Sequence, residues 1–184
     1  MRSLLLFLLL TACSNREVKD RAQDFPEGQV LLIGDSIAAA SNIEALCGKR
    51  VFNAAIGGTG VQEWSVLAPE LIQELRPTLV VVALGIVDAR RGTDPERWAS
   101  EYRDLISTAG TVALVSISPV DHAKITERRF SDDAIAVLND ELRQVALERG
   151  AKVAPPVAAP MTTDGIHLSP EGNREWTRNL SSVC

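Results

Sequence analysis

Three residues of this sequence have the types that nucleophilic catalysis requires: Ser36 in Gly-Asp-Ser-Ile, and Asp164 with His167 in Asp-Gly-Ile-His. A serine hydroxyl is a weak nucleophile until an imidazole removes its proton, and the imidazole needs a carboxylate that fixes its tautomer. In that chemistry Ser36 attacks a carbonyl carbon, His167 is the general base and Asp164 orients His167. Each motif alone is common in turns and helix caps, so the hypothesis requires a fold that brings the two segments together.

Apolar runs typical of buried strands alternate with segments of helical periodicity. The predicted strands are 30–34, 51–55, 78–84, 111–117 and 151–154. The predicted helices are an alanine-rich stretch at 36–48, a stripe from Trp64 to Leu75, a stripe behind Asp94 and Pro95, a stripe between Ser131 and Gly150, and a last helix that begins at Ser169 and Pro170. This alternation predicts right-handed βαβ units, hence an α/β fold with three αβα layers around a five-stranded parallel sheet.

Ligands of open α/β sheets bind at the carboxyl ends of the strands. Ser36 directly follows the first predicted strand, and the loop 162–170 follows the last one. We therefore expect Ser36, Asp164 and His167 to meet at one sheet edge. Because Ser36 begins a helix, its own amide can donate to the oxyanion that forms during attack on a carbonyl group.

The composition bounds the class of protein and its partners. The 184 residues are enough for one domain, 46% are hydrophobic, and the formal net charge is -5. The sequence has no cluster of Lys and Arg of the kind that phosphate backbones require, so nucleic acid is not an expected partner. We expect no metal site and no cofactor, because the two histidines are far apart and the Gly-rich segment 57–60 lacks the Lys of a phosphate loop.

The N-terminus has the layout of an export signal: Arg2, an apolar run at 4–10, and small residues before a cysteine. Leu10 to Cys13 resembles the lipobox of bacterial lipoproteins, whose cysteine is lipidated. This resemblance implies a signal peptide at 1–12, a lipid anchor at Cys13, and a place in the bacterial cell envelope, facing the periplasm from the outer membrane. The polar stretch 13–29 is predicted to be a flexible tether, and 30–184 the folded domain.

Export permits disulfides, and a lipidated Cys13 leaves Cys47 and Cys184 as a pair. In three-layer folds the first and last helices commonly share a face. Cys47 ends the first predicted helix and Cys184 ends the last, so both should lie at the sheet edge away from the ligands. A disulfide between them is the prediction, and two free thiols are the alternative.

The domain from Val30 onward resembles the SGNH, or GDSL, hydrolase superfamily in several blocks of sequence. "GDSI" at 34–37 matches the first block, "NAAIGG" at 53–58 the second, and "DGIHL" at 164–168 the last. The resemblance implies a flavodoxin-like αβα fold and cofactor-independent ester or thioester hydrolysis. It assigns Ser36 as nucleophile and first oxyanion donor, Gly58 as the second donor with Gly57 as the less favoured choice, and Asp164 and His167 as catalytic residues.

The third block departs from the family pattern. The superfamily has GxND there, and its asparagine is the third oxyanion donor, whereas this chain has Val87 in that place. Loss of one side-chain donor costs about 100- to 1000-fold in rate in a protease example. Either a substitute donor enters the site, or the enzyme is slow or acts on activated acyl groups, or the chain is an inactive binding protein. The candidate substitutes are Thr59, Gln62, Arg90 and His122.

Taken together, the sequence predicts a lipid-anchored, monomeric serine esterase of the cell envelope that acts on small acyl esters or O-acetylated glycans. The alternatives are a noncatalytic envelope-binding lipoprotein with the same fold, and an O-acyltransferase that passes the acyl group to a sugar hydroxyl.

Overall fold

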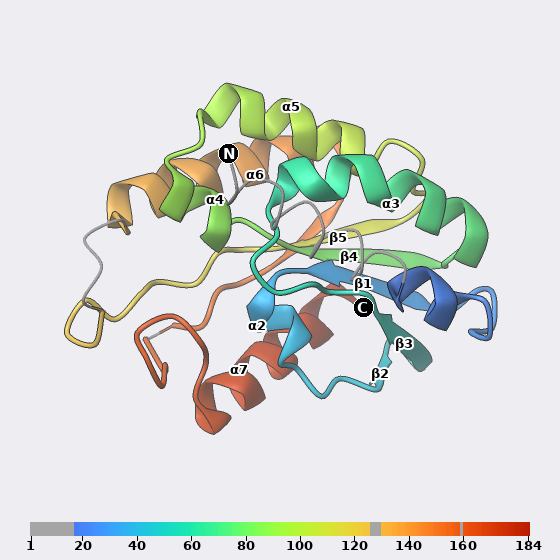
Figure 1. The fold of residues 1–184 in the computed structure, drawn as a ribbon, viewed down its shortest axis with the longest axis horizontal. Coiled ribbons are helices and arrows are strands. Elements are labelled where there is room, and N and C mark those ends of the chain that lie inside the picture. Colours follow the sequence, from blue (N-terminus) through green and yellow to red (C-terminus); the bar gives the residue numbers. More distant parts are fainter. Residues whose placement is uncertain (1–16, 126–129, 159) are drawn as a thin grey trace, which may run out of the picture.

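Strands and helices alternate in the computed structural model of the chain, which describes residues 17–125, 130–158 and 160–184 (Figure 1). The strands are β1 Val30–Gly34, β2 Ala45–Leu46, β3 Lys49–Asn53, β4 Leu79–Ala83, β5 Val112–Val115 and β6 Lys152–Ala154. The helices are α2 Ser36–Ala39, α3 Val61–Leu75, α4 Ile86–Arg91, α5 Pro95–Leu105, α6 Asp132–Arg149 and α7 Pro170–Leu180, followed by a 3₁₀ turn η1 at Ser181–Val183. The predicted α/β class is confirmed.

Within the described residues, the sheet has six strands in the order β2-β3-β1-β4-β5-β6. Five of them are parallel, as predicted, and their order is the flavodoxin-like one. The sixth strand, β2, was not predicted. It is two residues long and pairs antiparallel with β3 at the sheet edge.

Helices cover both faces of the sheet, so successive strand residues are buried on opposite sides. In β1, Leu31 and Ile33 pack with α3, α4, α5 and α6, whereas Val30 and Leu32 pack with α2 and α7. Figure 1 shows these two helical layers, with α3, α5 and α6 on one side and α2 and α7 on the other. Burial on both faces explains why the central strands are continuous apolar runs in the sequence.

The helix predicted at 36–48 is much shorter in the structure, where α2 ends at Ala39. Two polar side chains bind the carbonyl oxygen of Ala38: the Ser41 hydroxyl at 2.7 Å and the Asn53 amide at 2.8 Å. These bonds satisfy a carbonyl that a longer helix would have used, and the chain turns away to form β2. Alanine content alone therefore overestimated the helix.

The segment 17–29, predicted to belong to a flexible tether, packs against the domain. Residues 17–22 form a helix, and Val18 and Ala22 on it are buried in the core. Phe25 contacts Phe52 with ring centroids 5.0 Å apart. Because only these few side chains reach the core, the segment shows no clear apolar period. The predicted signal at 1–12 and Cys13 lie outside the described residues.

A disulfide joins Cys47 to Cys184, whose Cα atoms are 5.2 Å apart. The prediction that Cys47 ends a helix is wrong, because Cys47 lies with Gly48 in the turn between β2 and β3. Both turn residues have positive φ, 52° and 73°, as two-residue hairpin loops prefer. The turn precedes β3, so the disulfide still lies at the amino end of the parallel strands.

We predict that replacing both cysteines, Cys47→Ala with Cys184→Ala, lowers the free energy of unfolding by about 2 to 5 kcal/mol. The bridge closes a loop of 137 residues in sequence, and without it the unfolded chain gains the corresponding conformational entropy. Guanidinium denaturation followed by circular dichroism measures the change. The reduced wild-type protein is the control and should match the double variant. Equal midpoints for the oxidised wild type and the variant would contradict the prediction.

Candidate active site

Ser36, His167 and Asp164 form a continuous chain of hydrogen bonds at the carboxyl edge of the sheet. His167 Nε2 lies 3.0 Å from Ser36 Oγ, and His167 Nδ1 lies 2.6 Å from Asp164 Oδ2. The two segments are 131 residues apart in sequence, and the fold brings them together as predicted. This geometry orients the imidazole with one nitrogen toward the hydroxyl and the other toward the carboxylate.

The loop that carries Asp164 and His167 is held by its own hydrogen bonds. Asp164 Oδ1 accepts from the amides of Ile166 at 3.0 Å and His167 at 2.8 Å, so both carboxylate oxygens are engaged. The hydrogen bond to the His167 ring is the main reason that the pKa of Asp164 lies well below its usual range. The carboxylate is therefore ionised at any pH near neutrality.

Gly165 in this loop has no room for a side chain. Its φ is +96°, and a Cβ there would lie 2.4 Å from Ile125 Cγ1 and 2.9 Å from the carbonyl oxygen of Asp121. The carbonyl oxygen of Gly165 also accepts from the Asp121 amide at 2.9 Å. The glycine between Asp164 and His167 thus allows the loop to pack on the segment that follows β5.

Ser36 is the first residue of α2, directly after the strand β1 and Asp35. Asp35 caps this helix, since its Oδ1 accepts from the Ile37 amide at 2.9 Å. A Cβ at Gly34 would lie 2.3 Å from Ala38 Cβ, so only glycine permits the sharp turn from strand to helix. Ser36 itself is half-buried and reaches the loop of His167.

A tight turn at Gly57 and Gly58 lies beside Ser36. A Cβ at Gly57 would be 3.7 Å from Ser36 Cβ, and Gly58 has a φ of +78°. The Ile56 amide donates to Gly34 O at 3.0 Å, which joins the start of the turn to the end of β1. The predicted donor amides of this turn therefore lie in the segment next to the Ser36 side chain.

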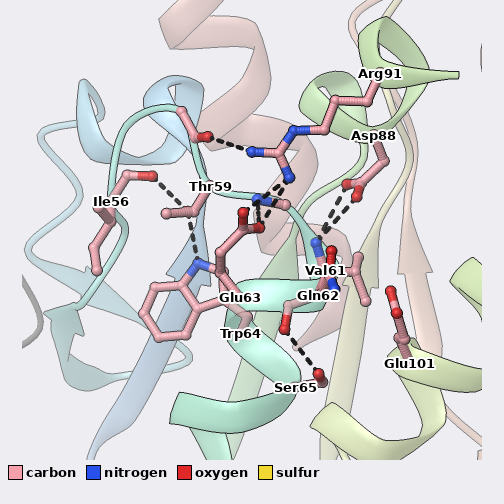
Figure 2. A network of polar contacts seen from close by, with 12 residues as sticks. Ile56, Thr59, Val61, Gln62, Glu63, Trp64, Ser65, Asp88, Arg91 and Glu101 are labelled. Carbon is pink, nitrogen blue, oxygen red and sulfur yellow. Dashed lines mark hydrogen bonds and ion pairs between the residues drawn. The ribbon is translucent and has the colours of Figure 1, made fainter. Parts of the chain in front are cut away.

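A polar network that the sequence interpretation missed supports the Gly57–Gly58 turn (Figure 2). Arg91 Nη2 donates to the Gly58 carbonyl at 3.2 Å, and Arg91 Nη1 donates to Glu63 Oε1 at 2.9 Å. Glu63 Oε2 accepts from the Gly60 amide at 2.8 Å, as an N3 glutamate does in a capping box. The spacing of Gly60 and Glu63 at the start of α3 was the available signal. Arg91 had none, because its partners are distant in sequence.

Asp88 of the third sequence block is buried and supports the same region. Both of its oxygens accept from the Val61 amide, at 3.2 and 3.3 Å, which fixes the start of α3 against α4 (Figure 2). Burial raises the pKa of Asp88. A Cβ at Gly60 would lie 2.5 Å from Asp88 Oδ1, so this close contact requires the glycine. Residues 86–91, directly after Gly85, form the short helix α4.

Val87 is half-buried in α4 and packs against the core cluster. Of the four candidate substitute donors, Thr59 is buried, and its hydroxyl donates to Ile56 O at 2.7 Å and accepts from Trp64 Nε1 at 3.0 Å. His122 pairs with Asp132 at 3.0 Å.

The Thr59 hydroxyl and the His122 ring therefore already have partners among other residues. Gln62 and Arg90 are exposed, on α3 and α4, and remain hypotheses.

Asp35 is a second buried carboxyl group next to the nucleophile, only 3% exposed. Burial raises its pKa to about 7, and the charge of Asp88 acts in the same direction, whereas the bond from the Ile37 amide opposes the shift. A carboxyl group with this pKa is largely protonated below neutral pH.

The structure thus combines a three-layer αβα fold with a serine, an imidazole and a carboxylate that lie together at the ends of its strands. The sequence profile of the GDSL-like Lipase/Acylhydrolase family matches residues 32–175, so the chain belongs to that family. This confirms the resemblance noted in the sequence and identifies the chain as a GDSL-type hydrolase.

Solved structures with the same fold include three from bacteria. A Streptococcus pneumoniae protein provisionally described as a platelet activating factor is 18% identical, covers 98% of this chain and 97% of its own, and has a TM-score of 0.77. A GDSL-like lipase from Bacteroides thetaiotaomicron is 18% identical, with coverage of 92% and 94% and a TM-score of 0.72.

A Bacteroides fragilis protein provisionally described as an acylhydrolase is 20% identical, with coverage of 89% and 91% and a TM-score of 0.70. No curated protein sequence matches the chain. At these identities the likeness establishes the fold.

Two further findings concern the described residues as a whole. No group of three or more His, Cys, Asp or Glu side chains within them is placed to hold a metal ion. Across the ranges 17–125, 130–158 and 160–184, no helix has the length and apolar composition needed to cross a membrane.

We predict that Asp35→Asn makes the protein more stable at pH 8 but not at pH 4. The folded-state pKa of Asp35 is raised from 3.8 to about 7, so its contribution to stability is complete below pH 4 and is lost as the pH rises to 7. Asparagine caps helices equally well and does not ionise. The free energy of unfolding of Asp35→Asn minus that of wild type should therefore increase by on the order of 2 to 4 kcal/mol between pH 4 and pH 8.

Urea denaturation at both pH values measures this difference, and Asp104→Asn, an exposed aspartate on α5, is the matched control. If the effect of Asp35→Asn is the same at both pH values, the assignment of the raised pKa to Asp35 is wrong.

Proposed function

We propose that the protein is a serine esterase in which Ser36 is the nucleophile, His167 the general base and Asp164 the residue that orients His167. The observation that supports this proposal is the continuous hydrogen-bond chain from Ser36 Oγ through both His167 nitrogens to Asp164 Oδ2. It is the arrangement that activates a serine hydroxyl at neutral pH.

The reaction follows from the atoms in that chain. Ser36 Oγ attacks the ester carbonyl carbon while its proton passes to His167 Nε2, and the Asp164 carboxylate stabilises the imidazolium. The tetrahedral intermediate then collapses, the C–O bond to the alcohol breaks, and His167 returns the proton to the leaving oxygen. Water, deprotonated by His167, attacks the acyl-enzyme in the same way and releases the acid and free Ser36.

We assign the oxyanion hole to the amides of Ser36 and Gly58. The Gly57–Gly58 turn adjoins Ser36, and Arg91 binds the Gly58 carbonyl at 3.2 Å, which fixes the peptide that directly follows the donor amide. Because Val87 stands where the family has a side-chain donor, the proposed hole has two backbone donors and lacks the third, side-chain donor. We therefore expect a working but slow enzyme.

We also propose that Cys13 carries a lipid anchor and that the enzyme acts in the cell envelope on small acyl esters, including O-acetylated glycans. The helix at 17–22 begins four residues after Cys13, and four residues span at most about 14 Å. Val18 and Lys19 on this helix line a small pocket with Ile56, which precedes the Gly57–Gly58 turn. An anchor at Cys13 would accordingly hold the active-site edge close to the membrane.

We predict that a fluorophosphonate probe labels the purified protein and that Ser36→Ala abolishes both labelling and hydrolysis of p-nitrophenyl acetate. Only an activated serine reacts with such a probe, because the attack requires the same proton transfer as ester cleavage. Ser100→Ala, at an exposed serine on α5, is the control and should label like wild type. Absence of labelling, under conditions in which a known serine esterase reacts, would favour the noncatalytic alternative.

We predict that Val87→Asn raises kcat for p-nitrophenyl acetate by about tenfold or more, because a side-chain donor at this position restores a missing oxyanion contact. The measurement is steady-state hydrolysis, with Val66→Asn as the control, since Val66 is 77% exposed on α3. An unchanged kcat would mean that another group already supplies the third donor, and Gln62→Ala and Arg90→Ala would then locate it.

A further inference from the structure

A small cavity opens beside the nucleophile, at the carboxyl ends of β4 and β5. Asp35 and Ile37, the two neighbours of Ser36 in the chain, lie on one side of it. Its volume is about 20 Å³, which is room for roughly one water-sized group. The remaining walls are mainly apolar and include Leu84, Ile86, Ile117 and Trp176.

The cavity lies opposite the proposed oxyanion hole. In the sheet, β1 stands between β3 and β4, the Gly57–Gly58 turn follows β3, and the cavity is at the ends of β4 and β5. An acyl group on Ser36 whose carbonyl oxygen points toward Gly58 therefore directs its alkyl chain toward the cavity. The leaving group must lie toward His167, which returns the proton to it.

Two of the polar side chains in the cavity wall already have partners. Asp35 Oδ1 accepts from the Ile37 amide at 2.9 Å, and Ser118 Oγ accepts from the Val157 amide at 3.1 Å. Asp35 is also largely protonated below neutral pH, as described above. The surface that remains for a ligand is mostly apolar, which suits an alkyl group.

Ile117 limits the size of this cavity, and its position is firmly fixed. The Asn139 side chain binds both polar groups of the Ile117 backbone: Oδ1 accepts from the amide at 2.8 Å and Nδ2 donates to the carbonyl at 3.0 Å. The Ile117 side chain lies over Gly85, where a Cβ would be only 2.4 Å from Ile117 Cδ1. Ile117 thus has no free space beneath it into which it could move to admit a longer chain.

We propose that this cavity receives the acyl group and that Ile117 is a specificity-determining residue, which restricts the enzyme to esters of acetate and other short acids. The proposal rests on the esterase function proposed above. Chains that exceed the cavity must either displace tightly packed side chains or remain in water, and both reduce transition-state binding.

The experiment compares kcat/KM for p-nitrophenyl acetate, butyrate and octanoate. For the wild-type enzyme we expect kcat/KM to fall by about tenfold or more from acetate to octanoate. Ile117→Ala should raise the ratio of octanoate to acetate activity by about tenfold or more, and Ile117→Val should raise it by a smaller factor. Ile117→Val removes only one methylene and tests the proposal even if Ile117→Ala folds poorly.

Ile72→Ala is the matched control, because Ile72 on α3 is 5% exposed, Ile117 is 6% exposed, and Ile72 does not line the cavity. This control should leave the octanoate-to-acetate ratio unchanged. A wild-type preference for octanoate, or an equal shift of the ratio in Ile72→Ala and Ile117→Ala, would overturn the assignment of Ile117 while leaving the esterase function intact. Failure of all three esters, together with no fluorophosphonate labelling, would instead overturn the esterase function and this inference with it.

Discussion

The parallel pairing of β1 with β3 on one side and with β4 on the other is the constraint on which the site depends. The register aligns Leu32 with Asn53 and Gly34 with Ala83, so three strands end at the same edge. Ser36 therefore emerges between the glycine turn after β3 and the helix α4 after β4. The loop of Asp164 and His167 needs only to cover this edge to complete the hydrogen-bond chain.

Close approach of the segments at this edge places two carboxyl groups in the protein interior. Asp35 fixes the first turn of α2 through the Ile37 amide, and Asp88 fixes the first turn of α3 through the Val61 amide. Burial raises the pKa of both, which means that desolvation outweighs the hydrogen bonds they accept. Asp35 and Asp88 thus position the backbone around Ser36 and Gly58. Their burial lowers the stability of the folded protein at neutral pH, where both carboxyl groups tend to ionise.

The elements that could be predicted from the sequence are those with strong local signals. Asp94, Ser131 and Ser169 cap α5, α6 and α7 through bonds to amides three residues later, as their residue types indicate. The predictions for 36–48 and 17–29 were incorrect for a different reason. The Asn53 side chain, on β3, binds the Ala38 carbonyl at the end of α2. Val18 is buried because it packs beside residues of α3. Such contacts join residues distant in the chain, so local composition does not indicate them.

The sequence by itself determined the chemical groups available to this protein: a serine after a buried strand, an aspartate and a histidine three residues apart, and a valine where the family has a donor. The tertiary structure decided the distance between Ser36 and His167, the support of Gly58 by Arg91, and the cavity wall at Ile117. Strand register and helix packing set those distances. Both arise from hydrogen bonds and apolar contacts between segments that meet only after folding, and no short stretch of sequence contains them.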